Sequence, residues 1–286
     1  MPDLSHLTAV APVANCIPPV SIAIDVLLPT QAGYPKRLHA LGWDSVLDVR
    51  GALHADSRAV AIVGARAASR SGMDRAHAVA KHLAAAGVRV VSGGALGIDG
   101  AAHRGSLAGG GLTTVVLGSG VDVAYPHRHA RLFDQIVEHG GALVSMFPRG
   151  MQPRRGTFVR RNPLIAALAD VVIVVEAEVH SGSMSTARAA REQGRVVAAC
   201  PGSVGCQRLL AGGAALVETG EDALAALAGE PRLPAPPALD GDAIAVRDAI
   251  AHGARDIDSI VGFTGLSVRA VLRALPQLES GPSRMQ

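Results

Sequence analysis

The 286-residue chain contains few aromatic residues, few cysteines and few lysines. Only seven residues are Phe, Tyr or Trp, so any stacking of nucleic-acid bases would depend on very few rings. The three cysteines, Cys16, Cys200 and Cys206, form no CxxC pair and have no histidine pair at zinc spacing beside them. We therefore expect neither a disulfide nor a metal site, and no motif indicates another cofactor.

Long apolar runs are also missing from the chain. No uninterrupted apolar segment approaches the roughly 20 residues that a membrane-spanning helix requires. The N-terminus lacks the basic start and continuous apolar stretch of a secretion signal. The two lysines, Lys36 and Lys81, do not follow a glycine, which excludes a Walker A phosphate loop. We expect a soluble, cytoplasmic protein that has no membrane partner.

Charge gives only a weak indication of a partner. The formal net charge is +3, and all but two of the 27 basic residues are arginine. A GC-rich coding bias would produce the same abundance of arginine, alanine and glycine. The composition is therefore compatible with nucleic-acid binding but does not identify it.

What the chain does contain is a regular alternation of short apolar runs and segments of helical periodicity. Strands that alternate with helices in this way predict an α/β fold with a doubly wound parallel sheet. The predicted strands are 59–63, 88–91, 113–117, 142–145, 171–175 and 196–200. The predicted helices are 73–83, 99–107, 130–139, 164–169 and 185–193.

Two of the predicted strands end in glycine-rich turns. Gly64 follows the first strand, and the second strand leads into Ser92, Gly93, Gly97 and Asp99. Small residues let backbone N–H groups approach an anion, and a following helix N-terminus favours negative charge. These turns are candidate phosphate loops, although a purely structural role is equally compatible with glycine at the end of a strand.

A segment rich in arginine, 149–162, follows the strand 142–145. It surrounds one ring, Phe158, with cations that include Arg155, Arg160 and Arg161. Cations for phosphates beside a ring for a base are what single-stranded nucleic acid requires. We interpret Asn162 and the proline after it as the start of the next helix. A solvated loop that contacts nothing is the alternative.

The strongest apolar strand, 171–175, precedes a turn rich in hydroxyl groups. Ser181, Gly182, Ser183 and Thr186 can donate hydrogen bonds to a phosphate at the start of the following helix, or can simply cap that helix. Two other groups resemble catalytic sets: the carboxylate pair Glu176 and Glu178, and the triad types Ser92, Asp99 and His103. The pair is more typical of solvated carboxylates. For the triad, a local contact between Asp99 and His103 is the simpler expectation. We therefore expect no catalytic residue.

The chain divides into four predicted parts. Residues 1–56 form an extension, with a poorly ordered start, and a small cap at the sheet edge. Residues 57–229 form the α/β domain, and 230–239, with four prolines in 230–238, form a stiff linker. Residues 240–286 contain three short helical patterns, which suit a winged-helix-like module with its turn at 264–267. A helical appendage for protein contacts is the alternative.

Taken in order, these motifs resemble those of the DNA-processing protein A (DprA/Smf) family over residues 34–220. Leu96 departs from the resemblance, because the family usually has arginine there. The matching motifs are Gly64-Ala65-Arg66, Ser92 to Asp99 with Ala101-Ala102-His103, Gly120 to Pro126, Phe158 to Asn162, Val175-Glu176-Ala177 with Ser181 to Ala187, and Pro201-Gly202.

The resemblance implies an extended Rossmann-like fold with a winged-helix-like module and no catalytic step. It also implies a homodimer that binds and protects incoming single-stranded DNA and loads the RecA recombinase during natural transformation. By position, the DNA-binding residues would be Arg66, Arg155, Phe158, Arg160, Arg161, Asn162, Ser181, Gly182, Ser183 and Thr186.

Two other functions remain open at this point. The first is an enzyme like the LOG-type phosphoribohydrolases, which cleave a nucleotide N-glycosidic bond. Glu176 would serve there, although Pro201-Gly202-Ser203-Val204 does not fit the PGGxGTxxE signature. The second is a Rossmann-like module that senses a nucleotide-derived signal.

Overall fold

The computed structural model describes residues 23–235 and 240–279. The predictions for the opening residues, for part of the linker and for the segment after the last helix fall on 1–22, 236–239 and 280–286, outside the described residues. The chain separates into two compact units, residues 1–233 and 234–286, and the division falls within the predicted linker. Each unit is described by itself.

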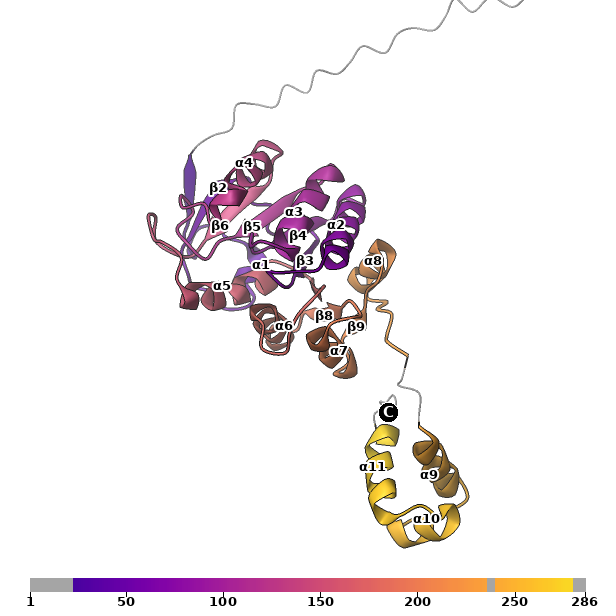
Figure 1. Cartoon of the computed structure of the whole chain (residues 1–286). Helices are drawn as coiled ribbons and strands as arrows, with labels where there is room; N and C mark the ends of the chain where they lie inside the picture. The colour runs from indigo at the N-terminus through magenta and orange to yellow at the C-terminus, as the bar shows by residue number, and fades with distance from the viewer. Residues whose placement is uncertain (1–22, 236–239, 280–286) are drawn as a thin grey trace, which may run out of the picture. The chain divides into compact units, whose positions relative to one another are not determined.

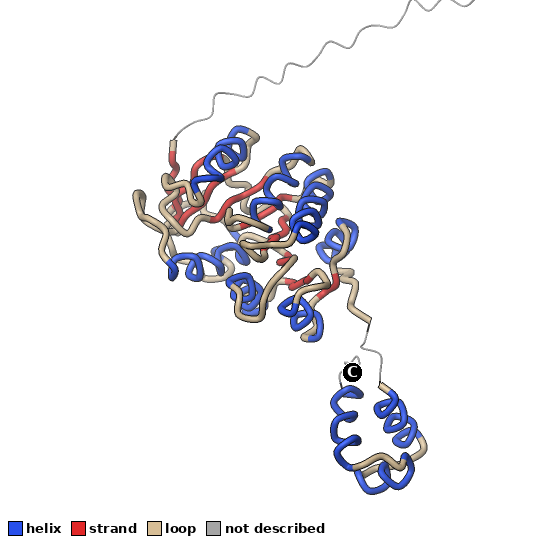
Figure 2. Tube along the Cα trace, viewed as in Figure 1, coloured by secondary structure: helices blue, strands red, loops and turns tan. Residues whose placement is uncertain are grey.

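The first unit is built on one nine-stranded sheet with the order β1-β2-β6-β5-β4-β3-β7-β8-β9 (Figures 1 and 2). All neighbours from β6 to β9 pair in parallel, whereas β1 and β2 add an antiparallel edge. The strands are β1 (Ile24–Leu27), β2 (Leu47–Gly51), β3 (Ala59–Val63), β4 (Arg89–Ser92), β5 (Thr113–Val116), β6 (Ala142–Ser145), β7 (Val171–Val174), β8 (Val196–Ala199) and β9 (Ala215–Leu216).

Helices cover both faces of this sheet, which confirms the predicted doubly wound arrangement. One face carries α2 (Arg70–Ala85), α3 (Ile98–Ala108), α4 (Ala130–Glu138) and α8 (Gly220–Ala228). The other carries α1 (Lys36–His39), α5 (Arg155–Ala167), α6 (Gly182–Glu192) and α7 (Val204–Ala211). A short 3-10 helix, η1 (His127–His129), precedes α4.

The core follows the two-residue period of the strands. In β3 the side chains of Ala59, Ala61 and Val63 pack towards α5 and α6, and those of Val60 and Ile62 pack towards α2 and α3. All five are buried, as expected for a strand with helices on both faces.

The antiparallel edge was not predicted. Residues that the sequence analysis assigned to an N-terminal extension and a small cap form β1 and β2, and β2 pairs with β6 in the register Asp48↔Ser145. β1 is short and not buried, and its sequence gives little strand signal. In β2 the apolar Leu47 and Val49 alternate with Asp48 and Arg50 and are buried, which is a short strand pattern that the sequence analysis missed.

The strand order reverses beside β3. The chain proceeds from β3 through β4 and β5 to β6 in one direction, and from β7 through β8 to β9 in the other. Open α/β sheets bind ligands at such a reversal, outside the carboxyl ends of the strands. The loops after β3 and β7 are therefore the place where a ligand site is expected.

The second unit consists of α9 (Gly241–Ala251), α10 (Ile257–Thr264) and α11 (Val268–Glu279). Its core contains Val246, Ile260 and Val271. Gly265 adopts the left-handed conformation that ends α10, so α11 begins directly after the predicted turn at 264–267. In the described ranges of both units, none of the helices has the length and apolar character needed to cross a membrane.

Candidate nucleic-acid interface

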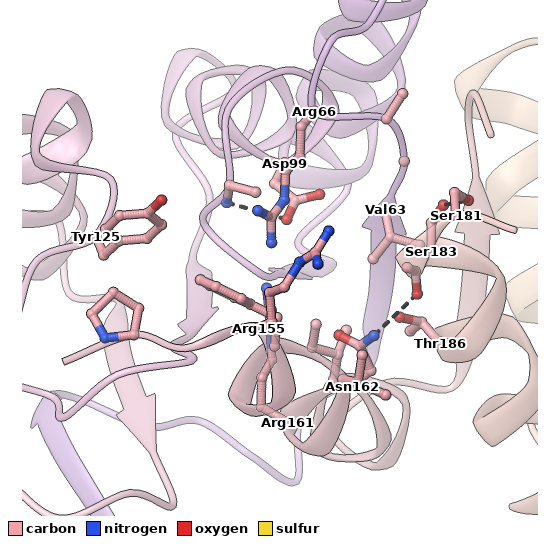
Figure 3. A pocket seen from close by; sticks show the side chains of 18 of the residues that line it. Val63, Arg66, Asp99, Tyr125, Arg155, Arg161, Asn162, Ser181, Ser183 and Thr186 are labelled. Atoms are coloured by element: carbon pink, nitrogen blue, oxygen red, sulfur yellow. Dashed lines mark hydrogen bonds between the residues drawn. The ribbon is translucent and has the colours of Figure 1, made fainter. Parts of the chain in front are cut away.

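A cavity of about 550 Å³ lies at the carboxyl ends of the strands, where the strand order reverses (Figure 3). Its wall comes from the loops after β3, β4, β5 and β6, from α5 and from the start of α6. The lining residues are Val63, Gly64, Ala65, Arg66, Ala95, Asp99, Tyr125, Pro153, Arg154, Arg155, Phe158, Val159, Arg161, Asn162, Ile165, Ser181, Gly182, Ser183 and Thr186.

Arg161 is the buried cation of this cavity, with only 4% of its surface exposed. Its Nη1 donates a 2.8 Å hydrogen bond to the carbonyl of Val116, and its guanidinium lies directly on Gly93. Burial lowers the pKa of Arg161 to about 10, and the negative charge of Asp99 opposes that shift. The guanidinium therefore remains charged at neutral pH, and its Nε has no hydrogen-bond partner. An anion entering the cavity would meet a cation that is poorly compensated.

Asp99 is the one carboxylate among the lining residues. Its Oδ2 accepts a hydrogen bond of 3.2 Å from the backbone N–H of Ala95. Burial raises the pKa of Asp99, and the charge of Arg161 partly offsets this effect. With Arg66, Arg154, Arg155 and Arg161 around a single carboxylate, the cavity favours an anionic guest.

Arg66 and Phe158 come from separate parts of the chain and meet in the cavity wall. The guanidinium carbon of Arg66 lies 4.4 Å from the centre of the Phe158 ring, a cation–π contact. The Tyr125 ring lies 5.7 Å from the same ring, centre to centre. The Arg66 loop is held by a 2.8 Å bond from the N–H of Ala65 to the carbonyl of Glu176. Packing thus fixes the position of an otherwise exposed cation.

The start of α6 supplies the neutral donors of the site. Ser181 occupies the N-cap position, and its hydroxyl bonds to the hydroxyl of Ser183 at 2.8 Å, so it does not cap the helix. Asn162 secures this turn, because its Nδ2 donates to the carbonyl of Gly182 at 3.0 Å and to the Ser185 hydroxyl at 2.6 Å. The first residues of α6 therefore line the same cavity as the arginines.

The predicted arginine loop is largely helical, which corrects the sequence interpretation. Asn162 does not start a helix, because α5 begins at Arg155 and Pro163 lies inside it. The start is set by Thr157, whose hydroxyl accepts from the N–H of Arg154 and donates to its carbonyl. The Asn-Pro pair indicated a helix start only by local preference, whereas the Asn162 side chain makes the contact with α6.

This helix separates the predicted cations. Phe158, Arg161, Asn162 and Ile165 follow the i, i+3, i+4, i+7 spacing of one helix face and line the cavity. Arg160 does not line it. Its guanidinium carbon lies 5.7 Å from the centre of the Phe147 ring.

The predicted phosphate-loop residues are only partly gathered at the cavity. Gly64 and Asp99 line it, whereas Ser92, Gly93 and Gly97 do not. Ser92 is fully buried and its hydroxyl donates to the carbonyl of Ile62 at 2.6 Å. Gly93 lies beneath the Arg161 guanidinium, and Gly97 begins α3. These three residues do not line the large cavity, although Gly93 lines a smaller hollow beside it.

The candidate catalytic groups have structural partners. Both carboxylate oxygens of Glu176 accept from the N–H of Ser69, and one also accepts from its hydroxyl, so Glu176 holds the start of α2. His103 does not pair with Asp99 as expected, because its Nδ1 lies 2.7 Å from the Thr113 hydroxyl. Glu176, on which the enzymatic alternative depends, and His103 of the triad types are thus held in structural contacts.

The sequence analysis did not include Tyr125 and Arg154 among the expected DNA-binding residues. Tyr125 lies in the motif Gly120 to Pro126, and Arg154 lies in the arginine-rich segment 149–162. The aromatic type of Tyr125 and its position after the strand 113–117 were the available signal. Nothing local indicated that its ring would contact Phe158.

Comparison with known proteins agrees with this architecture. The family description "DNA recombination-mediator protein A" matches residues 25–228, and "DprA winged helix domain" matches residues 230–279. Protein Smf of Escherichia coli is 44% identical over 182 residues, which cover 63% of this chain and 49% of that protein. The chain spans between about half and three fifths of the length of the curated relatives that it matches first.

Two solved structures share the fold. DNA processing protein A from Streptococcus pneumoniae has a TM-score of 0.66 at 38% identity, over 71% of this chain and 74% of that one. The same protein from Helicobacter pylori, solved for its single-stranded DNA binding mode, has a TM-score of 0.64 at 27% identity, over 74% and 98% of the two chains. By family match, sequence identity and fold together, this chain belongs to the DNA recombination-mediator protein A family.

Proposed function

We propose that this protein binds single-stranded DNA in the cavity at the carboxyl ends of β3 and β7. The observation that supports it most is the convergence of Arg66, Arg155 and Arg161, from two distant segments, on one cavity beside the start of α6. Guanidinium groups and backbone N–H groups are the donors that phosphate oxygens accept. The DNA-binding description of the Helicobacter pylori protein supports the same guest.

The residues proposed to contact the strand are those that line the cavity. Arg66, Arg155 and Arg161 would bind phosphates, and Ser181, Gly182, Ser183 and Thr186 would add neutral donors. Asn162 would act indirectly, because its amide is already bonded to the α6 turn. We leave Arg160 out of this set because it lies away from the cavity.

The matched test uses two exposed arginines of the same helix, α5. Arg155→Ala removes a cavity cation, whereas Arg160→Ala removes a cation outside the cavity. Fluorescence anisotropy with a labelled thymidine oligonucleotide should show a loss of about tenfold or more for Arg155→Ala. The magnitude of the negative slope of log K against log salt concentration should decrease by about 0.7. Arg160→Ala should change neither value. Equal losses in both variants, or stronger binding to duplex than to single strands, would refute the proposal.

We further propose that the bound strand is protected and passed to the RecA recombinase, and that the protein acts as a homodimer in natural transformation. Support for this step comes from the family assignment to recombination mediators. Light scattering of the purified chain tests the dimer. RecA assembly on single strands coated with single-strand-binding protein tests the loading, which should be faster with this protein than without it. No acceleration at saturating protein would contradict the loading role.

A further inference from the structure

A second, smaller hollow of about 60 Å³ adjoins the arginine-lined cavity. Arg66, Ala95 and Phe158 belong to the walls of both, so the two are continuous. Tyr125 also lines both, and the rest of the wall of the small hollow comes from Gly93, Leu96 and Pro126 and is mainly apolar. Leu96 is 39% exposed and Tyr125 is 40% exposed, so both offer open apolar surface beside the charged cavity.

The Phe158 ring itself is largely covered. The guanidinium of Arg66 lies over it, and the Tyr125 ring packs beside it. Gly118 lies so close that a Cβ there would come within 2.7 Å of the ring. Phe158 thus supports Arg66 and Tyr125. Phe158 lines both hollows but is only partly exposed, so Tyr125, which is 40% exposed, offers the more open aromatic surface beside the cavity.

We propose that this small hollow is a nucleobase subsite, in which one base of the strand packs against Tyr125 and Leu96 while the adjoining phosphate lies in the arginine cavity. This inference rests on the proposed single-stranded DNA binding. An aromatic ring and an aliphatic side chain match the flat, apolar faces that all bases share, so the subsite would accept any base. Arg66, shared by both walls, connects the base with its phosphate.

The subsite also explains a preference for single strands. The faces of bases in a duplex are stacked on one another, and a base would have to leave the stack before it could reach Tyr125. A flexible single strand presents its bases at a much smaller cost. The arginines alone would attract either form, because both carry phosphates.

The test compares two oligonucleotides of equal length, one of thymidines and one of abasic residues, with wild type, Tyr125→Ala and Tyr125→Phe. Tyr125→Ala should lose about 5- to 100-fold on the thymidine strand and little on the abasic strand. Tyr125→Phe should restore most of the binding, since it keeps the ring. A 2-aminopurine base should lose fluorescence on binding to wild type, and this quenching should disappear in Tyr125→Ala.

Equal losses on the base-bearing and abasic strands, or unchanged binding of Tyr125→Ala to both, would overturn the subsite. Leu96→Ser provides a second variant in case Tyr125→Ala does not fold, and should show the same dependence on the base. If wild type binds neither strand, the proposed function is refuted, and the subsite is refuted with it. Binding of wild type without any base dependence refutes the subsite alone.

Discussion

Adding one methyl group beneath Arg161 tests whether the position of its guanidinium, and not merely its charge, is needed for binding. A Cβ on Gly93 would lie 1.9 Å from Nη1 and 2.4 Å from the guanidinium carbon of Arg161. The backbone of Gly93 does not have a positive φ, so alanine is compatible with its conformation. Gly93→Ala therefore displaces the cation while it leaves the net charge of the chain unchanged.

The expected size of the effect follows from these distances. Ordinary van der Waals contact begins at 3.4 Å, so Nη1 would have to move by about 1.5 Å. That movement breaks the 2.8 Å bond from Nη1 to the carbonyl of Val116 and displaces the cation from its place in the cavity. The bond to Val116 is internal, so its loss lowers the stability of the fold. The affinity falls because the displaced guanidinium loses a charge-assisted hydrogen bond to the phosphate, which costs roughly 1.5–3 kcal/mol, or about 10- to 100-fold.

Anisotropy titrations at several salt concentrations measure this effect. We expect Gly93→Ala to bind a thymidine oligonucleotide 10- to 100-fold more weakly, with a salt slope smaller by up to about 0.7. Gly156→Ala is the matched control. It lies within α5 beside the cavity, but its added Cβ would meet nothing within 4 Å. This control should bind as wild type and gain up to about 1 kcal/mol in stability. Wild-type affinity and salt slope in Gly93→Ala would refute the role assigned to Arg161.

Three further predictions concern buried and capping groups. Asp99→Asn should lose less stability than wild type between pH 4 and pH 8 in urea unfolding. Burial raises the pKa of Asp99, so wild-type stability falls as its carboxyl ionises with rising pH. His103→Gln should flatten the loss of stability between about pH 6.5 and pH 3. Burial lowers the pKa of His103 to about 3, so the unfolded chain binds a proton that the folded chain refuses, at up to about 1.4 kcal/mol per pH unit. Glu176→Gln should lower the free energy of unfolding by roughly 1–2 kcal/mol without changing DNA affinity, because Glu176 bonds to Ser69 and does not line the cavity.

The parts of the site that depend on strand order were predictable from the sequence. Apolar runs that end in glycine or serine turns fix where parallel strands stop, and all those stops lie on one edge of the sheet. Gly64, Arg66 and Ser181 each follow such a run, and the structure places all three at one cavity. This prediction needed no knowledge of side-chain packing.

The parts that depend on packing were not predictable in the same way. Successive side chains of an α-helix point about 100° apart, so Arg160 and Arg161 face different directions. Which of them enters the cavity was not predictable without knowing that α5 begins at Arg155. The Thr157 turn that sets this start carries no strong sequence signal. Glu176 follows a strand end like the cavity residues, yet it turns to Ser69 because the start of α2 provides unpaired donors there.

The burial of Arg161 has two opposing effects on this cavity. Arg161 needs burial to be held in place, yet burial removes the water that stabilises its charge. The carbonyl of Val116 and the nearby carboxylate of Asp99 replace only part of the lost solvation. The Nε of Arg161 has no hydrogen-bond partner. A phosphate in the cavity would bring negative charge beside this under-solvated cation, and this attraction would contribute to the proposed affinity for the backbone of the strand. Tyr125 and Leu96 would add the contact that only an unstacked base can make, and the two together distinguish a single strand from other polyanions.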